Sequence, residues 1–285
     1  MDIAGSTQNT NGSAEPQYTL TFLGTGASCG VPSFYCGCKA CDEARVNPRA
    51  ARDCSGLLIT GEQHTLVDAA PELRTQLIRE GVSTVDQAIF THEHFDHIGG
   101  IPQLEFFVLL KAKTPVPVYA GAQTLATIKQ QFAFMLDTLD LHLVEAFETL
   151  CFDGVTYTAL PAAHSQGCFG YLIEVEHGAT GISRTAYFPD TGPLPPETLD
   201  FLHNLDALDN LIIDSTFSGA NWMPKSHHSI DEAIAFAQRL KPRHTYLTHL
   251  AMHFDEPITL AELELKLAAC DVPISVAYDG LRIVL

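Results

Sequence analysis

Hydrophobic residues recur along the chain in two patterns, from residue 18 to the C-terminus. Short apolar runs bounded by glycine, proline or aspartate predict strands, and apolar positions three or four residues apart predict helices. The predicted strands cover residues 18–23, 56–60, 65–69, 87–90, 116–120, 156–161, 169–175, 185–188, 210–214, 245–248, 274–278 and 281–285. The predicted helices cover residues 71–80, 96–110, 122–135 and 195–205, and two more begin at capping boxes led by Ser229 and Thr259.

These elements are mixed throughout, without a repeat or a clear linker. We therefore predict one α/β domain over residues 18–285. Residues 1–17 are polar and rich in Ser, Thr, Asn and Gly, which predicts a flexible N-terminal tail. Residues 27–51 predict a long irregular loop, which needs a staple or a function in a compact domain. Asp279-Gly280 predicts a hairpin turn between the last two strands.

Several of the apolar strands are followed by a histidine or an aspartate. The segment His92–His97 follows the strand at 87–90, and His164, Asp190 and His249 follow later strands. Loops at strand ends commonly carry the catalytic groups of α/β folds, because the scaffold holds them in place. The pattern marks these residues as candidate catalytic groups.

The segment after the strand at 87–90 carries four candidate metal ligands in six residues, namely His92, His94, Asp96 and His97. Neutral imidazoles and carboxylates suit Zn(II), Mn(II) or Fe(II). The segment also lies where a strand ends and a helix begins, which is a structural context that a metal motif requires. This arrangement favours a metal site over an ordinary solvated loop.

The composition restricts the class of partner. The chain has 34 acidic and 16 basic residues, so its formal net charge is −18. Proteins that bind long nucleic acids usually carry a basic surface, so such a partner is not expected. A small anionic substrate remains compatible, because bound divalent cations dominate the field around them.

The N-terminus and the cysteines bear on the compartment. The first residues lack the basic and apolar regions of a signal peptide, and no uncharged apolar run is long enough to cross a bilayer. The eight cysteines are unevenly placed, which does not fit the disulfide framework of a small secreted protein. We therefore expect a soluble cytoplasmic protein with no membrane partner.

Residues 91–100, Thr-His-Glu-His-Phe-Asp-His-Ile-Gly-Gly, resemble the HxHxDH segment of the metallo-β-lactamase superfamily. The resemblance runs from about Tyr18 to the C-terminus and implies a four-layer αββα sandwich. Residues 23–26, 30–32 and a Cys-x-Cys-x-x-Cys loop are similar to one branch of that superfamily. This branch contains the PhnP-like cyclic ribose-phosphate phosphodiesterase of the carbon–phosphorus lyase pathway and the PqqB proteins of pyrroloquinoline quinone biosynthesis.

The resemblance implies an active site with two divalent metal ions, zinc or manganese. The implied ligands are His92, His94 and His164 for one metal, Asp96, His97 and His249 for the second, and Asp190 as a bridge. Such a pair lowers the pKa of a water molecule to about 7, and the resulting hydroxide would attack phosphorus. The resemblance also places a catalytic histidine at His227, and an imidazole is suited to protonate the leaving group. We predict that Asp96 is a second catalytic residue.

Cys36, Cys38 and Cys41 predict a structural zinc site that would stabilise the long loop. The relatives take the fourth ligand from a histidine shortly after the counterpart of His249. The aligned position here is Met252, so we predict the next residue, His253, as the fourth ligand.

The predicted function is a metal-dependent hydrolase, specifically a phosphodiesterase for a small, sometimes cyclic, phosphate ester. A PqqB-like redox or accessory role is the alternative, although PqqB proteins typically depart from the HxHxDH pattern that this chain keeps. An RNA-processing nuclease of the same fold fits the acidic composition less well. A non-enzymatic zinc-binding module would not need so many catalytic-type ligands. The resemblance further implies a homodimer.

Overall fold

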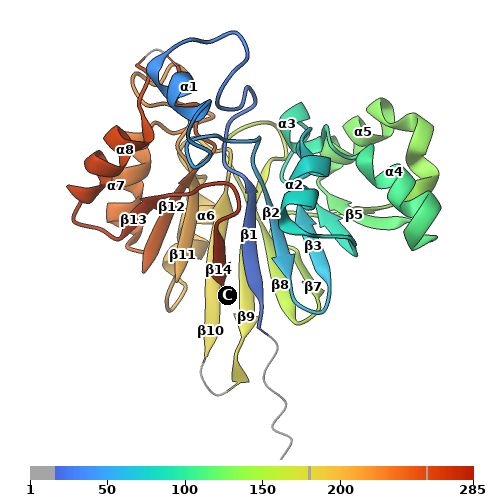
Figure 1. The fold of residues 1–285 in the computed structure, drawn as a ribbon. Coiled ribbons are helices and arrows are strands. Elements are labelled where there is room, and N and C mark those ends of the chain that lie inside the picture. Colours follow the sequence, from blue (N-terminus) through green and yellow to red (C-terminus); the bar gives the residue numbers. More distant parts are fainter. Residues whose placement is uncertain (1–16, 179–180, 255) are drawn as a thin grey trace, which may run out of the picture.

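Two seven-stranded sheets pass through the centre of the computed structural model, which describes residues 17–178, 181–254 and 256–285. Helices lie on the outer sides of both sheets (Figure 1). This arrangement confirms the predicted αββα sandwich. The predicted tail at residues 1–17 lies, except for Gln17, outside the described residues.

The first sheet has the strand order β14-β1-β2-β3-β4-β5-β6. Its neighbours are antiparallel from β14 to β3 and parallel from β3 to β6. The strands, in sheet order, are Arg282–Val284, Thr19–Gly24, Gly56–Thr60, His64–Val67, Gln87–Ile89, Val116–Ala120 and Leu139–Leu143.

The second sheet has the order β13-β12-β11-β10-β9-β8-β7. Its neighbours are parallel from β13 to β10 and antiparallel from β10 to β7. The strands, in sheet order, are Ile274–Val276, His244–Thr248, Asn210–Asp214, Ile182–Phe188, Phe169–Glu176, Val155–Pro161 and Thr149–Phe152.

Apolar side chains from the two sheets pack against each other. Phe22 and Ile59 of the first sheet share one buried cluster with Tyr157, Tyr171 and Ile212 of the second. Each fully buried side chain of this size contributes about 1.5–3 kcal/mol relative to an exposed one. The two sheets therefore form one continuous core, which fixes the strand ends of one sheet relative to those of the other.

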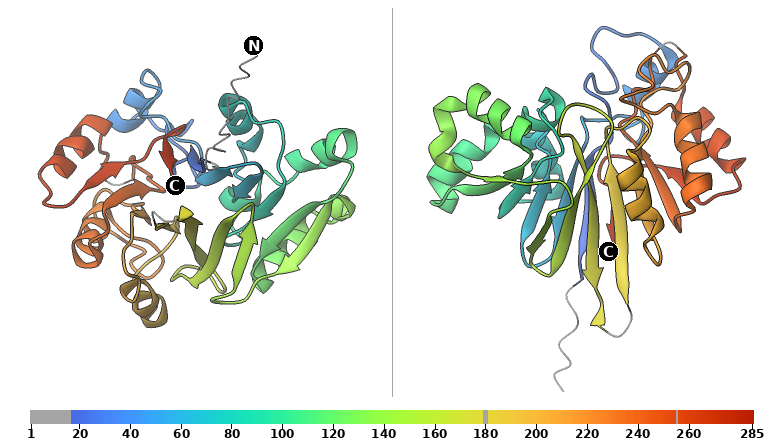
Figure 2. Two further views of the ribbon diagram at one scale, coloured as in Figure 1. Left: turned by 90° about the horizontal axis from the view of Figure 1, so that it is seen from below. Right: turned by 180° about the vertical axis from the view of Figure 1, so that it is seen from behind.

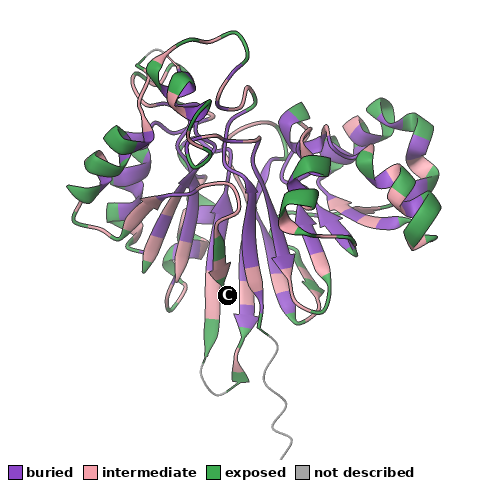
Figure 3. Cartoon of the chain, in the orientation of Figure 1, coloured by how far each residue is buried: buried purple, intermediate pink, exposed green. Residues whose placement is uncertain are grey.

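Helices cover the outer faces of both sheets (Figure 2). On the first sheet these are α2 Leu73–Glu80, α3 Phe95–Ile98, α4 Gln103–Phe107, the π-helix η1 Val108–Ala112, α5 Ala122–Gln131 and the 3-10 helix η2 Ala133–Thr138. On the second sheet these are α1 Lys39–Ala44, α6 Pro196–His203, α7 Ile230–Leu240 and α8 Leu260–Ala268. Their inner faces are buried and their outer faces exposed, as the amphipathic pattern predicts (Figure 3).

Most predicted elements are present, and both predicted capping boxes form. Ser229 and Glu232 bond reciprocally at the start of α7, as do Thr259 and Glu262 at the start of α8. The predicted loop at 27–51 contains the short helix α1. The edge strands β6 and β7 were not predicted, because their polar and half-exposed residues lack a continuous apolar run.

Two predictions were wrong. The expected helix at 96–110 is divided into α3, α4 and η1, with Gly99 to Pro102 between the first two. The expected hairpin at Asp279 does not exist, because β13 belongs to the second sheet and β14 to the first. The segment crosses between sheets instead: the Ala277 N–H donates to Leu247 O, and the Gly280 N–H donates to Phe22 O.

Candidate metal centre

Histidines and aspartates from four strand ends meet near α3, at the upper end of the sheets in Figure 1. We call this set the His/Asp cluster; its members follow or lie near β4, β8, β10 and β12, and two are on α3. They are His92, His94, Asp96, His97, His164, Asp190 and His249. The structure thus brings together every residue that the sequence predicted for the dinuclear centre, and their roles as metal ligands stay predictions.

One half of the cluster consists of three imidazoles. Ligand atoms of His92, His94 and His164 all lie within 4.8 Å of one another. Nε2 of His164 is 2.9 Å from Nδ1 of His94, and the His92 ring lies against both at centroid distances of 4.6 and 4.7 Å. This is the set predicted to hold the first metal.

The other half combines a carboxylate with two imidazoles. Oδ2 of Asp96 is 3.4 Å from Nε2 of His97 and 3.4 Å from Nε2 of His249. Asp190 lies between the halves, with Oδ2 2.7 Å from His97 Nε2 and Oδ1 3.2 Å from His249 Nε2 and 3.9 Å from His164 Nε2. A position between both groups is what a bridging carboxylate requires.

Four imidazoles in the cluster use Nδ1 for a hydrogen bond to the surrounding protein. The partners are Thr91 Oγ1 for His92 at 3.0 Å, Asp68 Oδ2 for His97 at 2.8 Å, Ser226 O for His164 at 2.8 Å and Thr216 Oγ1 for His249 at 2.9 Å. Each ring therefore presents Nε2 to the centre. Such outer partners fix ring orientation and tautomer in metal sites.

The donor set fits divalent cations. Nε2 of His92, Nε2 of His97 and Oδ2 of Asp190 are buried without a well-formed hydrogen bond, and the last two face each other at 2.7 Å. Unsatisfied buried polar atoms are costly and rare in native proteins. Three of them converging in one cluster indicate that the cluster is built for a group that accepts lone pairs, and imidazole with carboxylate suits zinc or manganese.

Burial and mutual charge shift the pKa values in the cluster in opposite directions. Burial, followed by the charge of His97, holds the pKa of His92 well below its usual range. Burial opposes ionisation of Asp96, but the charge of His97 and hydrogen bonds outweigh it and lower the pKa of that carboxyl. For Asp190 the charges of His249 and His97 likewise outweigh burial and lower the pKa. The carboxylates therefore stay ionised at neutral pH.

His227 joins the edge of the cluster, where it lines a pocket of about 250 Å³. Its Nδ1 is 2.8 Å from Oδ2 of Asp214 and 3.4 Å from Oδ1 of Asp190. Its neighbour His228 packs against Phe236 instead, with ring centroids 6.0 Å apart. The structure thus places His227, and not His228, beside the other predicted catalytic residue, Asp96, which lines the same pocket.

Two carboxylates that support the cluster were missed. Asp68 follows β3 and accepts from His97 Nδ1 and from the Thr91 N–H at 2.8 Å each. Asp214 ends β11 and holds His227 and Thr216. Both end apolar strands, so the signal that identified Asp190 could have identified them. Asp68 and His249 also adopt φ of 63° and 55°, a backbone strain that accumulates at functional sites.

The three thiols of Cys36, Cys38 and Cys41 form a second group, with sulfur atoms within 4.8 Å of one another. Burial raises the pKa of Cys41 to about 12, and neighbouring thiols add to the shift. A bound cation would offset the repulsion between neighbouring thiolates, because it binds the thiolate form of each cysteine. His253 is not in this group: its Nε2 lies 3.1 Å from Sγ of Cys29, so its role as fourth ligand stays a prediction.

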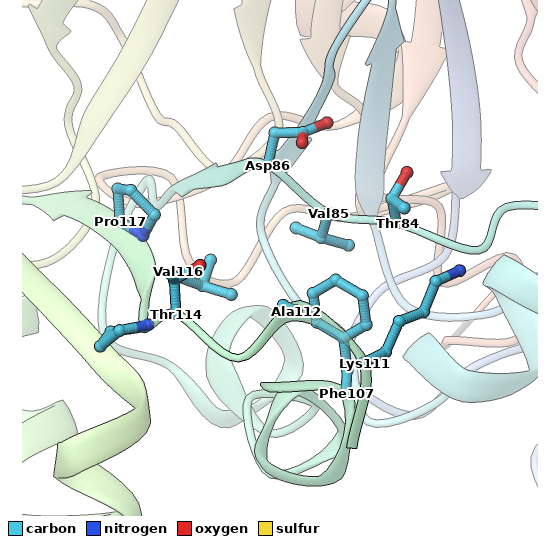
Figure 4. Close-up of a pocket in the computed structure, with 10 residues that line it drawn as sticks. Thr84, Val85, Asp86, Phe107, Lys111, Ala112, Thr114, Val116 and Pro117 are labelled. Carbon is cyan, nitrogen blue, oxygen red and sulfur yellow. The ribbon is translucent and has the colours of Figure 1, made fainter. Parts of the chain in front are cut away.

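A roomier pocket of about 570 Å³ lies between the segments 84–86 and 107–117 (Figure 4). It shares no lining residue with the pocket over the His/Asp cluster. Its walls are mainly apolar, and none of its ten lining residues is a histidine or cysteine. The Lys111 ammonium on its rim donates to Ser83 O at 2.7 Å. Its size alone gives it no chemistry, and the smaller pocket over the cluster carries the reactive groups.

The arrangement of sheets and cluster agrees with the comparison to known families. The family model described as "Beta-lactamase superfamily domain" matches residues 63–250, which is more than half of the chain. The chain belongs to this superfamily. It has the metallo-β-lactamase fold. No helix in the described part of the chain has the length and apolar character needed to cross a membrane.

Three known proteins illustrate the similarity. The crystal structure of "a New Diphosphatase from the PhnP Family" superposes with a TM-score of 0.80 at 27% identity, over 94% of this chain and 97% of that one. "Coenzyme PQQ synthesis protein B" of Methylobacterium nodulans is 27% identical over 230 residues, covering 68% of this chain and 71% of the relative. An "Octanoyltransferase" of Porphyromonas gingivalis is 24% identical over 274 residues, or 92% of this chain; the chain spans only 51% of that relative's length.

Proposed function

We propose that the chain is a phosphodiesterase that cleaves small phosphate esters, cyclic ones included. The observation that carries the proposal is the convergence of three buried ligand atoms, His92 Nε2, His97 Nε2 and Asp190 Oδ2, in one cluster. Similarity to a diphosphatase of the PhnP family supports phosphorus chemistry, because 27% identity extends over nearly the whole of both chains.

In this proposal the two halves of the His/Asp cluster, together with Asp190, would hold two divalent cations, zinc or manganese. Two such cations supply Lewis-acid chemistry, an activated water and neutralisation of charge on phosphoryl oxygens. Asp96 is ionised and lines the pocket, so it can accept a hydrogen bond from the attacking water. His227 delivers a proton to the leaving oxygen.

His227 is suited to that task by its contacts. Its Nδ1 is bonded to Asp214, which leaves Nε2 as the nitrogen that can reach a substrate in the pocket. A positioned histidine acting as general acid contributes about 10²–10⁴-fold to the rate of such a step. The ring also stacks over His249 at a centroid distance of 5.5 Å, which places it directly beside the cluster.

A PqqB-like role in cofactor synthesis is the second candidate, because PQQ synthesis protein B is similar over about two thirds of this chain. Such a role would be redox or accessory chemistry without phosphate release. The unbroken HxHxDH segment at His92–His97 and the position of His227 favour hydrolysis.

Zinc- or manganese-loaded protein should be tested on bis(p-nitrophenyl) phosphate, on a 2′,3′-cyclic nucleotide and on a nucleoside diphosphate ester. We expect diester cleavage that disappears with chelator and in Asp190→Asn, and that persists in the matched surface variant Asp140→Asn. Cleavage of the diphosphate alone would replace the phosphodiesterase proposal with a diphosphatase. Absence of turnover on all three would favour the PqqB-like role.

A further inference from the structure

The pocket over the His/Asp cluster has two chemically different walls. One wall is formed by the cluster itself with His227, and the other by the aromatic rings of Phe217, Trp222 and Phe254. The three rings contact one another, with centroids 4.9 Å apart for Phe217 and Trp222, 5.9 Å for Phe217 and Phe254 and 6.1 Å for Trp222 and Phe254. The proposed chemistry makes no use of this aromatic wall.

The members of the wall differ in exposure. Phe217 is only 2% exposed and contacts both other rings, whereas Trp222 is 59% exposed. A tryptophan of that exposure leaves a large apolar area in contact with water. Covering that area with a ligand would contribute about 25 cal/mol for each Å² buried. Its ring beside a reactive centre is therefore free to cover a ligand.

A second pocket of about 410 Å³ continues from the same two rings. Trp222 and Phe254 line both pockets, and Tyr35, Cys36, Gly37 and His253 complete the second. None of these six lining residues is Asp, Glu, Lys or Arg. A neutral planar group would find aromatic faces there.

The loop that carries Trp222 is fixed by hydrogen bonds to the catalytic side of the pocket. The Asn221 side-chain amide donates to His227 O at 2.8 Å and to Glu232 Oε2 at 2.7 Å, and its Oδ1 accepts from the Met223 N–H at 2.9 Å. The Ser218 hydroxyl donates to Glu256 O at 2.6 Å, which joins this loop to the one that carries Phe254. The aromatic wall is therefore held at a defined position relative to His227.

We propose that Trp222 and Phe254 form a subsite for a planar, uncharged aromatic group of the substrate, such as a nucleobase, joined to the phosphorus that the cluster binds. The subsite rests on the proposed function for the position of the phosphoryl group. Stacking of a base on an aromatic side chain is sequence-tolerant and strong enough to set substrate preference. The chain then discriminates between aromatic and aliphatic phosphate esters through these two rings.

Binding can be measured without turnover, because Trp222 is the one tryptophan of the chain. Zinc-loaded protein should be titrated with AMP and with ribose 5-phosphate while the tryptophan fluorescence is recorded. We expect saturable quenching by AMP at concentrations about tenfold lower than any effect of ribose 5-phosphate. In Phe254→Ala the dissociation constant for AMP should rise about tenfold, whereas Phe134→Ala, an exposed ring on η2, should leave it unchanged. Equal responses to both ligands would overturn the subsite.

Two esters with the same leaving group separate the subsite from the reaction. Thymidine 5′-(p-nitrophenyl phosphate) and ethyl p-nitrophenyl phosphate both release p-nitrophenol, so a difference in kcat/KM reports the second ester group. We expect the nucleoside ester to be preferred about tenfold, the preference to be lost in Trp222→Ala and largely restored in Trp222→Phe. Hydrolysis of both esters without preference contradicts the subsite and leaves the hydrolase intact. Quenching by AMP without hydrolysis of either ester contradicts the phosphodiesterase and leaves the subsite intact.

Discussion

Asp214 Oδ2 accepts a hydrogen bond from Nδ1 of His227 at 2.8 Å, and both side chains are buried. The same carboxylate group accepts from the Thr191 N–H at 3.0 Å and from the Thr216 hydroxyl at 2.7 Å. Because Asp214 ends β11 in the middle of the second sheet, its position is fixed by strands on both sides. The sheet therefore holds the imidazole of His227 in one orientation.

His227→Ala should reduce kcat on a phosphodiester with an alkyl leaving group by about 100-fold or more, because the leaving alkoxide loses its proton donor. The loss should be much smaller for a p-nitrophenyl ester, because nitrophenolate leaves without protonation. Steady-state kinetics on the two esters, with metal content measured on the same sample, checks this. An equal loss on both would show that His227 acts in some way other than as the acid.

Asp214→Asn should slow the alkyl ester by about 10- to 100-fold, because the amide cannot hold the ring of His227 as a carboxylate does. The defect should have the same dependence on the leaving group as that of His227→Ala. Combining the two substitutions tests their coupling. If the double variant is slower than His227→Ala by the full Asp214→Asn factor, the two residues act independently and Asp214 is not a positioning residue.

Asp68→Asn should weaken binding of the second metal by about 10- to 100-fold, because His97 loses the acceptor that orients its ring. Competition with a chromogenic chelator measures the affinity. Asp140→Asn is the matched control, since Asp140 is 2.9 Å from His142 in an exposed Asp–His pair. Unchanged metal affinity in Asp68→Asn would mean that Asp68 serves only the fold.

Local signals in the sequence marked the members of the His/Asp cluster as candidates, and the resemblance to the superfamily implied that they meet. Asp96 and His97 belong to a dense motif, and Asp190 and His249 each follow an apolar strand. In an α/β fold the ends of parallel strands meet at one edge of the sheet, so residues that each follow a strand lie close together in the folded protein. Asp68 and Asp214 carry the same signal and could have been included.

The features that the sequence did not predict depend on contacts between distant segments. The side chain of Asp279 accepts from Thr25 Oγ1 and from the Asp53 N–H, so the Asp-Gly pair crosses between sheets and does not close a hairpin. The aromatic wall joins Trp222 and Phe254 from two loops whose packing no local pattern encodes. Edge strands such as β6 lack an apolar run because only one flank is paired.

Cys41→Ser should lower the zinc content of the purified protein by about one ion and reduce its thermal stability, while the metal of the His/Asp cluster is retained. Cys41 is the buried member of the three-thiol group, so its loss leaves two thiols that hold zinc weakly. Cys151→Ser, at an exposed cysteine, is the matched control. Elemental analysis and a melting curve check the prediction, and unchanged zinc content in Cys41→Ser would contradict it.

His253→Ala and Cys29→Ser together test the fourth ligand of that site. If His253 is the ligand, His253→Ala should weaken zinc retention in a chelator challenge and Cys29→Ser should not. The comparison is informative because His253 Nε2 and Cys29 Sγ are in contact at 3.1 Å, so the two side chains lie next to each other. Faster zinc loss in Cys29→Ser alone would assign the ligand to the cysteine.

Asp279 gives the stability of the protein a specific dependence on pH. Its side chain is 11% exposed, and burial raises its pKa to about 6, although hydrogen bonds from Asp53 and Thr25 oppose the shift. A carboxyl whose pKa is raised by folding favours the folded state fully below its unfolded pKa and loses that contribution as pH rises through the folded value. The full effect is roughly 3 kcal/mol, since one pKa unit is about 1.36 kcal/mol.

Asp279→Asn replaces the titrating carboxyl group with an amide that does not titrate. Since only the wild type loses stability as this carboxyl ionises, the free energy of unfolding of the variant relative to the wild type should rise with pH. Between about pH 4.5 and 7.5 we expect the difference to move in favour of the variant by about 2 kcal/mol, the part of the effect that develops in that window. Urea unfolding with chelator present at each pH measures it without the contribution of metal loss. Asp271→Asn, at an exposed position, should show no such trend. A difference that stays constant across the range would mean that Asp279 is ionised in the folded protein throughout, and that the Thr25 and Asp53 donors outweigh its burial.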